Sequence, residues 1–174
     1  MIEQLKGIEK KLDESLVKNA PFQLPDGLKE WIVKYGPYIA LVSGIFGLLA
    51  SLNLWNYAHQ ANNVINYTND IYKSYGVSVG ANRIHVWFYI ALVVSIIQSV
   101  IAIAAFSGLK ARNKLKGWDL MFYSGMLSLV YGIFNAIYYS SFGSLVGGIL
   151  GSLIGFYFLF QIRSKYNGAK TSKK

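Results

Sequence analysis

Hydrophobic and polar positions are sharply segregated along the chain. Three stretches, 35–58, 86–109 and 120–162, contain no Asp, Glu, Lys, Arg or His, and they are 24, 24 and 43 residues long. Because a helix needs about 20 residues to cross the roughly 30 Å core of a bilayer, the first two stretches each predict one transmembrane helix and the third predicts two. The break in the third is expected at YYSSFGS, residues 138–144, where small polar residues suit a turn at the membrane surface.

The predicted fold is therefore all-α: a polytopic membrane protein with a four-transmembrane-helix bundle and an N-terminal amphipathic interfacial helix. The composition agrees, because 53% of the residues are hydrophobic and only 14% are charged, which is unlike a soluble domain. We divide the chain into a cytoplasmic segment, a transmembrane domain and a basic cytoplasmic tail, at residues 1–34, 35–162 and 163–174. The spans are expected at 35–58, 86–109, 120–139 and 142–162.

The segment before the first span predicts two short helices. Apolar residues recur there at steps of three and four, as on one face of an amphipathic helix: Ile2, Leu5, Ile8, Leu12 and Leu16. We expect this helix to lie on the inner membrane surface; the alternative is pairing with a copy of itself, which Gly7 disfavours. A second short helix is expected from Asp26, with a bend into the first span at Gly36 and Pro37. The polar residues after the first span predict that its helix continues beyond the span, up to a turn before Arg83.

Lysine and arginine are distributed unevenly between the two sides of the predicted membrane. Residues 1–34, 108–119 and 163–174 hold fifteen of the 17, whereas the 59–85 loop holds two. Because positively charged flanks stay in the cytoplasm, both termini and the 108–119 connector are predicted inside a cell (plasma) membrane, with the 59–85 loop outside. The tryptophans fall at predicted span ends, as in interfacial aromatic belts: Trp31 and Trp118 at inner ends, Trp55 and Trp87 at outer ends.

The densest basic cluster, GLKARNKLKGWD at 108–119, has two interpretations. One is an anion or nucleic-acid site; the other is a topology signal whose cations touch lipid headgroups, which we favour for a short loop between two spans. The predicted headgroup contacts are Lys110, Arg112, Lys114, Lys116, Arg163 and Lys165. The expected partners are thus anionic inner-leaflet lipids, and no nucleic acid is needed to explain the net charge of +9.

Small residues recur at every fourth position in the last two spans. The predicted helix-packing residues are Gly143, Gly147, Gly151 and Gly155 in the fourth span, and Ser124, Ser128, Gly132 and Ala136 in the third. Shorter sets occur at Ser43, Gly47 and Ser51 and at Ala91, Ser95 and Ser99. Small residues let helix backbones approach closely in lipid, so we expect packing within one bundle, with a homo-oligomer interface or the lining of a permeation path as alternatives.

Titratable chemistry is nearly absent from the predicted spans. The intramembrane polar residues Gln98 and Asn135 are expected to meet as an interhelical hydrogen bond rather than to contact a substrate. His59, Asp70 and His85 are candidate metal ligands, but their spacing matches no metal motif. The sequence has no cysteine, and it shows no acid–base pair, activated nucleophile or phosphate loop. We therefore expect no enzyme, no catalytic or metal residues and no cofactor.

Two segments carry a family resemblance: ARNKLKGWDLMFYSGMLSLVYGIFN at 111–135 and GGILGSLIGFYFLFQIRSKY at 147–166. Together they resemble small four-span bacterial integral membrane proteins of a family without an assigned function, and the resemblance covers residues 30–166. It implies a prokaryotic plasma membrane and four helices, and it brings no activity or site residue with it. Tetraspanin-like, claudin-like and small multidrug exporter proteins fit less well, because they need extracellular cysteines or a membrane carboxylate.

Two function classes follow from the sequence. The favoured one is a structural or interaction protein, with tightly packed helices and a basic cytoplasmic surface that faces lipids or a partner. The alternative is a small channel or facilitator for a neutral or weakly polar solute, lined by Gln98, Asn135 and the serines of the spans. We favour the first because the spans contain few polar residues for a water-filled path.

Overall fold

The computed structural model describes residues 2–20, 22–77 and 81–166, and it is helical throughout most of them. The helices are α1 (Ile2–Asp13), α2 (Asp26–Ser74), α3 (Val86–Lys110), α4 (Asp119–Tyr138) and α5 (Phe142–Gln161). Short helical turns follow or join them: η1 (Glu14–Lys18), η2 (Lys114–Trp118) and η3 (Arg163–Tyr166). The last part of the predicted basic tail, residues 167–174, lies outside the described residues, as do the side chains of Ile2 and Leu5.

Four helices are long and apolar enough to cross a membrane. They lie within Asp26–Ser74, Val86–Lys110, Lys116–Tyr138 and Phe142–Gln161. The predicted all-α class and the four candidate transmembrane helices are thus confirmed. The predicted span ends at 86, 109 and 142 agree with the helix ends to within one residue, because a stretch without charged residues ends where the helix meets polar surroundings.

The first span differs from the sequence prediction. Asp26–Ser74 is a single helix of 49 residues, so the short helix expected from Asp26 is its first part and no separate element. Pro37 lies inside this helix, and its side chain is almost fully buried. A proline removes one hydrogen bond from a helix interior, and membrane helices tolerate this loss where neighbouring helices pack around it. The expected extension of the helix beyond the first span is confirmed.

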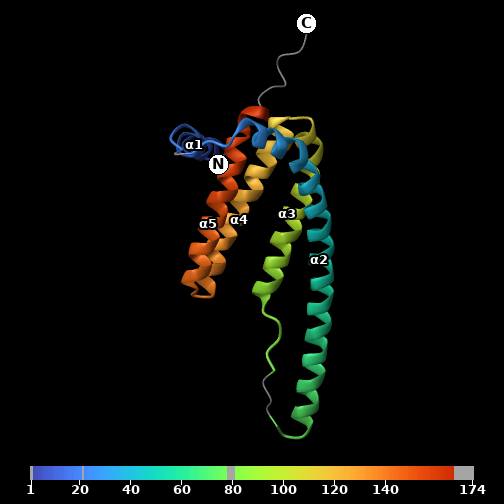
Figure 1. Ribbon diagram of the computed structural model, residues 1–174. Helices are drawn as coiled ribbons and strands as arrows, with labels where there is room; N and C mark the ends of the chain where they lie inside the picture. Colours follow the sequence, from blue (N-terminus) through green and yellow to red (C-terminus); the bar gives the residue numbers. More distant parts are fainter. Residues whose placement is uncertain (1, 21, 78–80, 167–174) are drawn as a thin grey trace.

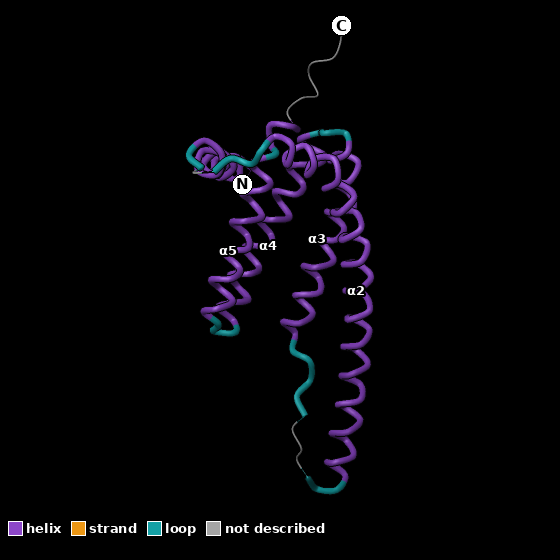
Figure 2. The backbone as a smooth tube through the Cα atoms, viewed as in Figure 1, coloured by secondary structure: helices purple, strands orange, loops and turns teal. Residues whose placement is uncertain are grey.

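The chain forms two helical hairpins, α2 with α3 and α4 with α5, joined at one end (Figure 1). Within the described residues α2 packs on α3, α3 on α4 and α4 on α5, whereas no comparable interface joins α2 to α5. Helix α1 lies across the joined end, and the described C-terminal turn η3 lies there as well (Figure 2).

The α2–α3 hairpin is held by close backbone contact. A Cβ atom built at Gly44 would lie 2.9 Å from the Ser99 carbonyl oxygen, and one at Gly47 would lie 2.7 Å from the Ser99 Oγ. One turn further, Ser51 Oγ donates a hydrogen bond of 2.8 Å to Ser95 Oγ. The shorter small-residue sets of the first two spans therefore face each other, in the way that lipid-embedded helices associate.

The hydrophobic core sits at the joined end of the two hairpins. Trp118, Phe122 and Phe160 are almost fully buried there. The Trp118 ring stacks on Phe122 at 5.6 Å and meets the edge of Phe160 at 5.1 Å, and its Nε1 donates a 2.7 Å hydrogen bond to the Leu159 carbonyl. Trp118 keeps the predicted place at the end of a candidate span, but its side chain is a core residue, because the connector folds back over the ends of α3 and α5.

Candidate functional site

The two hairpins diverge from their joined end, and the space between them is a groove of about 610 Å³. All four long helices line it, and small residues form much of its surface: Gly36, Ser43, Gly44, Ser95, Ser99, Ser124, Gly125, Ser128, Gly151, Ser152 and Gly155. Because α2 and α5 share no extensive interface, the groove opens sideways between these two helices. In a bilayer this opening faces lipid rather than water.

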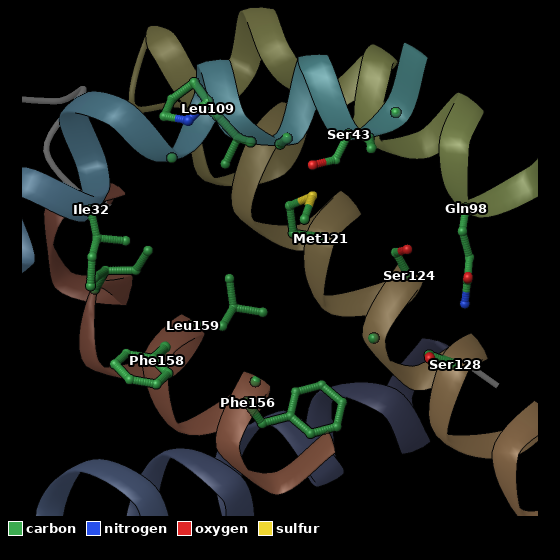
Figure 3. A pocket seen from close by; sticks show the side chains of 18 of the residues that line it. Ile32, Ser43, Gln98, Leu109, Met121, Ser124, Ser128, Phe156, Phe158 and Leu159 are labelled. Carbon is green, nitrogen blue, oxygen red and sulfur yellow. The ribbon is translucent and has the colours of Figure 1, made fainter. Parts of the chain in front are cut away.

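The polar groups of the groove are neutral. Ser43 comes from α2, Gln98 from α3, and Ser124 and Ser128 from α4, and Figure 3 shows them around the same space. At the joined end lies Tyr166, where burial raises the pKa to about 12 and keeps the phenol uncharged at physiological pH. The groove can therefore offer hydrogen bonds and apolar contact, but its lining holds no Asp, Glu, Lys, Arg or His to act as a general acid or base.

The aromatic core closes the groove at the joined end. Leu109, Phe156, Ile162 and Tyr166 belong both to the groove lining and to the core cluster that contains Trp118. All five side chains are buried. The groove is therefore open at its side, between α2 and α5, and we call this opening the mouth. At the end that carries the connector, the described residues leave no open passage.

An ion-pair network covers this closed end. Lys114 Nζ lies 2.9 Å from carboxylate oxygens of both Glu9 and Asp119, and Arg163 pairs with Glu9 and, at 2.8 Å, with Asp13. Burial opposes the charge on Lys114, but the hydrogen bonds that the amine donates to Asp119 and Glu9 outweigh it and raise the pKa of the amine above its ordinary value. The network ties α1 to the connector and to η3, across sequence separations above 100 residues.

Further contacts attach the N-terminal segment to α5. Gln161 Nε2 donates to the Leu16 carbonyl at 3.0 Å, and Tyr157 Oη donates to the Phe22 carbonyl at 2.6 Å. Leu12 and Leu16, two positions of the predicted amphipathic face, pack against the hydrophobic core. This part of the apolar face is thus partly buried against the protein itself.

Four of the six predicted headgroup cations form ion pairs within the chain. Lys114 and Arg163 belong to the network over Trp118, while Arg112 and Lys165 bind the carboxylate of Glu30 at 2.8 and 3.0 Å. Lys110 lies over the rings of Tyr38 and Phe106, and the exposed Lys116 shows no ion pair among the described residues. Six acidic residues in the first 34 positions balance six lysines there, and this balance is the sequence signal for such pairing.

The glycine stripe of α5 does not pack on α4 within one chain. A Cβ atom built at Gly143, Gly147, Gly151 or Gly155 would meet no neighbouring atom within 4 Å, and the same holds for Gly132 of α4. The α4–α5 contact instead uses Gly125, where an added Cβ would lie 2.9 Å from the Phe156 ring. Gly151 and Gly155 line the groove with Ser124 and Ser128, and Ala136 is buried elsewhere on α4.

The predicted Gln98–Asn135 hydrogen bond does not form. Asn135 Oδ1 accepts a 2.9 Å hydrogen bond from Trp87 Nε1, while Gln98 lines the groove. The prediction is wrong because depth in the membrane does not determine which helix faces carry the two amides. Near Asn135, Tyr138 Oη hydrogen-bonds the His85 ring at 2.9 Å, so α3 and α4 are joined by an aromatic cluster away from the joined end.

The three candidate metal ligands do not gather. Within the described ranges no group of three or more His, Asp and Glu side chains lies close enough to hold a metal ion. His85 caps the N-terminus of α3 by accepting a 3.2 Å hydrogen bond from the Trp87 amide. Near the other end of the same loop, Asn66 accepts a 2.5 Å hydrogen bond from Arg83 Nε.

Comparison with other proteins gives no functional assignment, so a function has to be argued from the geometry of the structure. No protein-family model, no curated protein and no solved structure matches the chain. The groove between the hairpins is accordingly the candidate site, because it brings predicted polar and small residues of all four long helices together.

Proposed function

We propose that the protein is a non-catalytic interaction protein of the membrane, which receives a transmembrane helix of another membrane protein in its groove. The observation that carries this proposal is the unfilled glycine face of α5 along the mouth of the groove. Helices in lipid associate where small residues let backbones approach, and this mouth presents such residues with nothing against them.

The orientation proposed is the one that the cation distribution predicts. We place the joined end, with α1, the connector and η3, in the cytoplasm of a plasma membrane, where Lys110 and Lys116 face anionic headgroups. Two findings support it: the basic connector and η3 share one end of the bundle, and these two lysines are exposed. An incoming helix would then fill the bilayer gap between α2 and α5.

A facilitator for a neutral solute is the second candidate. Gln98 and the groove serines favour it, because they offer hydrogen bonds at membrane depth. The closed end disfavours it, since permeation needs openings on both sides and the aromatic core fills one of them. A helix partner accounts for both the lateral mouth and the closed end.

Photo-crosslinking from inside the groove tests the proposal. A photoreactive residue at Ser128 should form an adduct with a peptide that mass spectrometry identifies as a transmembrane segment, and Gly151→Ile should abolish that adduct by filling the mouth. The matched position is Val130, exposed on the other side of α4, where adducts with lipid alone are expected.

Two outcomes would overturn the helix-receiving role. Adducts with lipid alone at Ser128 would identify a lipid as the occupant. Solute flux through liposomes that contain the purified protein, blocked by Gly151→Ile, would favour the facilitator instead.

A further inference from the structure

Helix α2 projects well beyond the rest of the bundle. Its 49 residues correspond to about 73 Å, more than twice the roughly 30 Å of a bilayer core. Asn62 Nδ2 donates a 3.0 Å hydrogen bond to Tyr89 Oη near the start of α3, so the remaining turns of α2 lie past the end of its partner helix. Figure 1 shows this projection beyond the α4–α5 turn as well.

One face of the projection is polar and binds the returning chain. Asn62 Oδ1 accepts a hydrogen bond from the Ile84 amide at 2.7 Å, and Asn69 Nδ2 donates to the Ala81 carbonyl at 3.1 Å. Asn66 lies between them and holds Arg83. The three asparagines follow helical spacing, so they form a ladder along a single side of α2.

The opposite face of the projection is apolar and exposed. It carries Val64, Tyr67, Ile71 and, directly after the helix, Tyr75, and Tyr57 extends it toward the bundle with the exposed Gln60 in between; Val64 is 64% and Tyr67 70% exposed. This arrangement reverses the usual amphipathic helix, in which polar residues face water and apolar residues face the protein. An aromatic and aliphatic stripe directed away from its own bundle marks a contact surface.

The spacing of the stripe fits another helix. The steps of three and four from Val64 to Tyr67 and Ile71 match those at which one helix packs its side chains into a second, and the seven-residue step from Tyr57 passes over the exposed Gln60 on the same side. The same side of α2 continues toward the membrane with exposed Ile39, Val42, Phe46, Leu49 and Asn53 at steps of three and four. A partner that contacts this whole face has to be a long helix that runs alongside α2.

We propose that this face pairs in parallel with α2 of a second copy of the chain. Two copies insert into one membrane with the same orientation, so their α2 helices run in the same direction and each residue of the stripe meets its own counterpart. Asn53 then faces Asn53, and a pair of amides is better placed against each other than against lipid. Such polar pairs, at Asn53 and at the exposed Gln60 of the same face, also set the register of a mostly apolar seam.

The area of the face is adequate for a stable dimer. An aromatic side chain can bury roughly 200 Å², and Tyr57, Tyr67 and Tyr75 are each at least two-thirds exposed. Together with Val64 and Ile71 these side chains offer about 600 Å² per copy, near the lower end of specific interfaces. The continuation through Phe46 and its neighbours brings the seam above that limit. It lies opposite the α3-facing side of α2, so the proposed groove function and this pairing are separate contacts.

Single cysteines test the pairing directly, because the chain has none of its own. In native membranes, Val64→Cys and Ile71→Cys should each form a disulfide-linked dimer on mild oxidation, since a disulfide requires Cα atoms within about 7 Å. The matched control is Lys73→Cys, exposed on the asparagine side of the same helix, which should stay monomeric. Failure of both stripe variants, or equal dimer formation by Lys73→Cys, would overturn the proposal.

A second measurement excludes chance collision. Val64→Lys combined with Ile71→Lys should convert the species measured by mass in detergent from dimer to monomer while its helical circular dichroism is retained, because both side chains are exposed in one chain. A monomeric wild type, or a mass unchanged by the substitutions, would contradict the pairing. Neither result affects the adduct expected at Ser128, so this pairing and the groove function can fail independently.

Discussion

Gly108 and Gly117 lie backbone against backbone where the connector folds over the end of α3. A Cβ atom on Gly117 would stand 2.5 Å from the Leu109 nitrogen and 2.6 Å from the Gly108 carbonyl carbon. A Cβ atom on Gly108 would lie 2.2 Å from the Lys116 carbonyl carbon. The turn is completed by Arg112 at a φ of 52° and by the Asn113 amide, which donates a 2.7 Å hydrogen bond to the Gly108 carbonyl. This contact seats Trp118 in the core.

Replacing Gly108 with Ala should therefore destabilise the protein. Alanine improves helix propensity over glycine by about 1 kcal/mol, but overpacking against backbone atoms costs about 1–3 kcal/mol or more, and the steric cost dominates at these distances. The melting temperature in detergent should fall. The matched variant is Gly148→Ala, where an added Cβ meets nothing within 4 Å, and its melting temperature should be unchanged or slightly higher. Equal melting temperatures for the two variants would show that the connector does not need this contact.

Acid should weaken the joint between α2 and the C-terminal turn through Glu30. Hydrogen bonds from Lys165 and Arg112 lower the pKa of this carboxyl below its ordinary value of 4.5, despite the opposing effect of desolvation. A group whose pKa is lower in the folded state stabilises the fold above its unfolded pKa, and this contribution is lost as the pH falls through the folded value. We expect the melting temperature to decrease below about pH 4.5.

In the variant Glu30→Gln, the melting temperature should decrease less over the same acidic pH range than it does in the wild type. Asp26→Asn is the matched control, because Asp26 lies on the same helix and forms no ion pair among the described residues. Its profile should follow that of the wild type. If the melting temperature of Glu30→Gln also follows the wild-type pH profile, Glu30 does not contribute to the loss of stability in acid.

Bulky residues should have opposite effects at two glycines of the spans. Gly44→Leu places branched bulk against the Ser99 carbonyl and should lower the melting temperature by an amount that corresponds to about 1–3 kcal/mol. Gly151→Leu should leave the stability of the monomer unchanged, because its added atoms enter the groove. Thermal unfolding of both variants in detergent measures the difference. A large decrease in the melting temperature of Gly151→Leu would mean that the two hairpins close on each other and fill the groove.

Much of the secondary structure follows from sequence alone. The charge-free stretches predict the four long helices, because the cost of burying charge in lipid depends on each residue and hardly on its distant neighbours. The amphipathic period around Leu12 predicts α1 for a similar reason, since helical spacing determines which residues share a face. The continuation of the first span as far as Ser74 is readable from the same kind of pattern.

Only the tertiary structure decides which of these residues meet. Gly47 packs against Ser99 while Gly151 faces open space, although both lie in stripes of small residues, because the rotation and divergence of whole helices determine the contact. Lys114 pairs with Glu9, 105 positions away, and Asn135 binds Trp87 rather than Gln98. Such pairings depend on the relative placement of distant segments, which local propensity and hydropathy do not contain. The lateral mouth of the groove is the consequence of that placement.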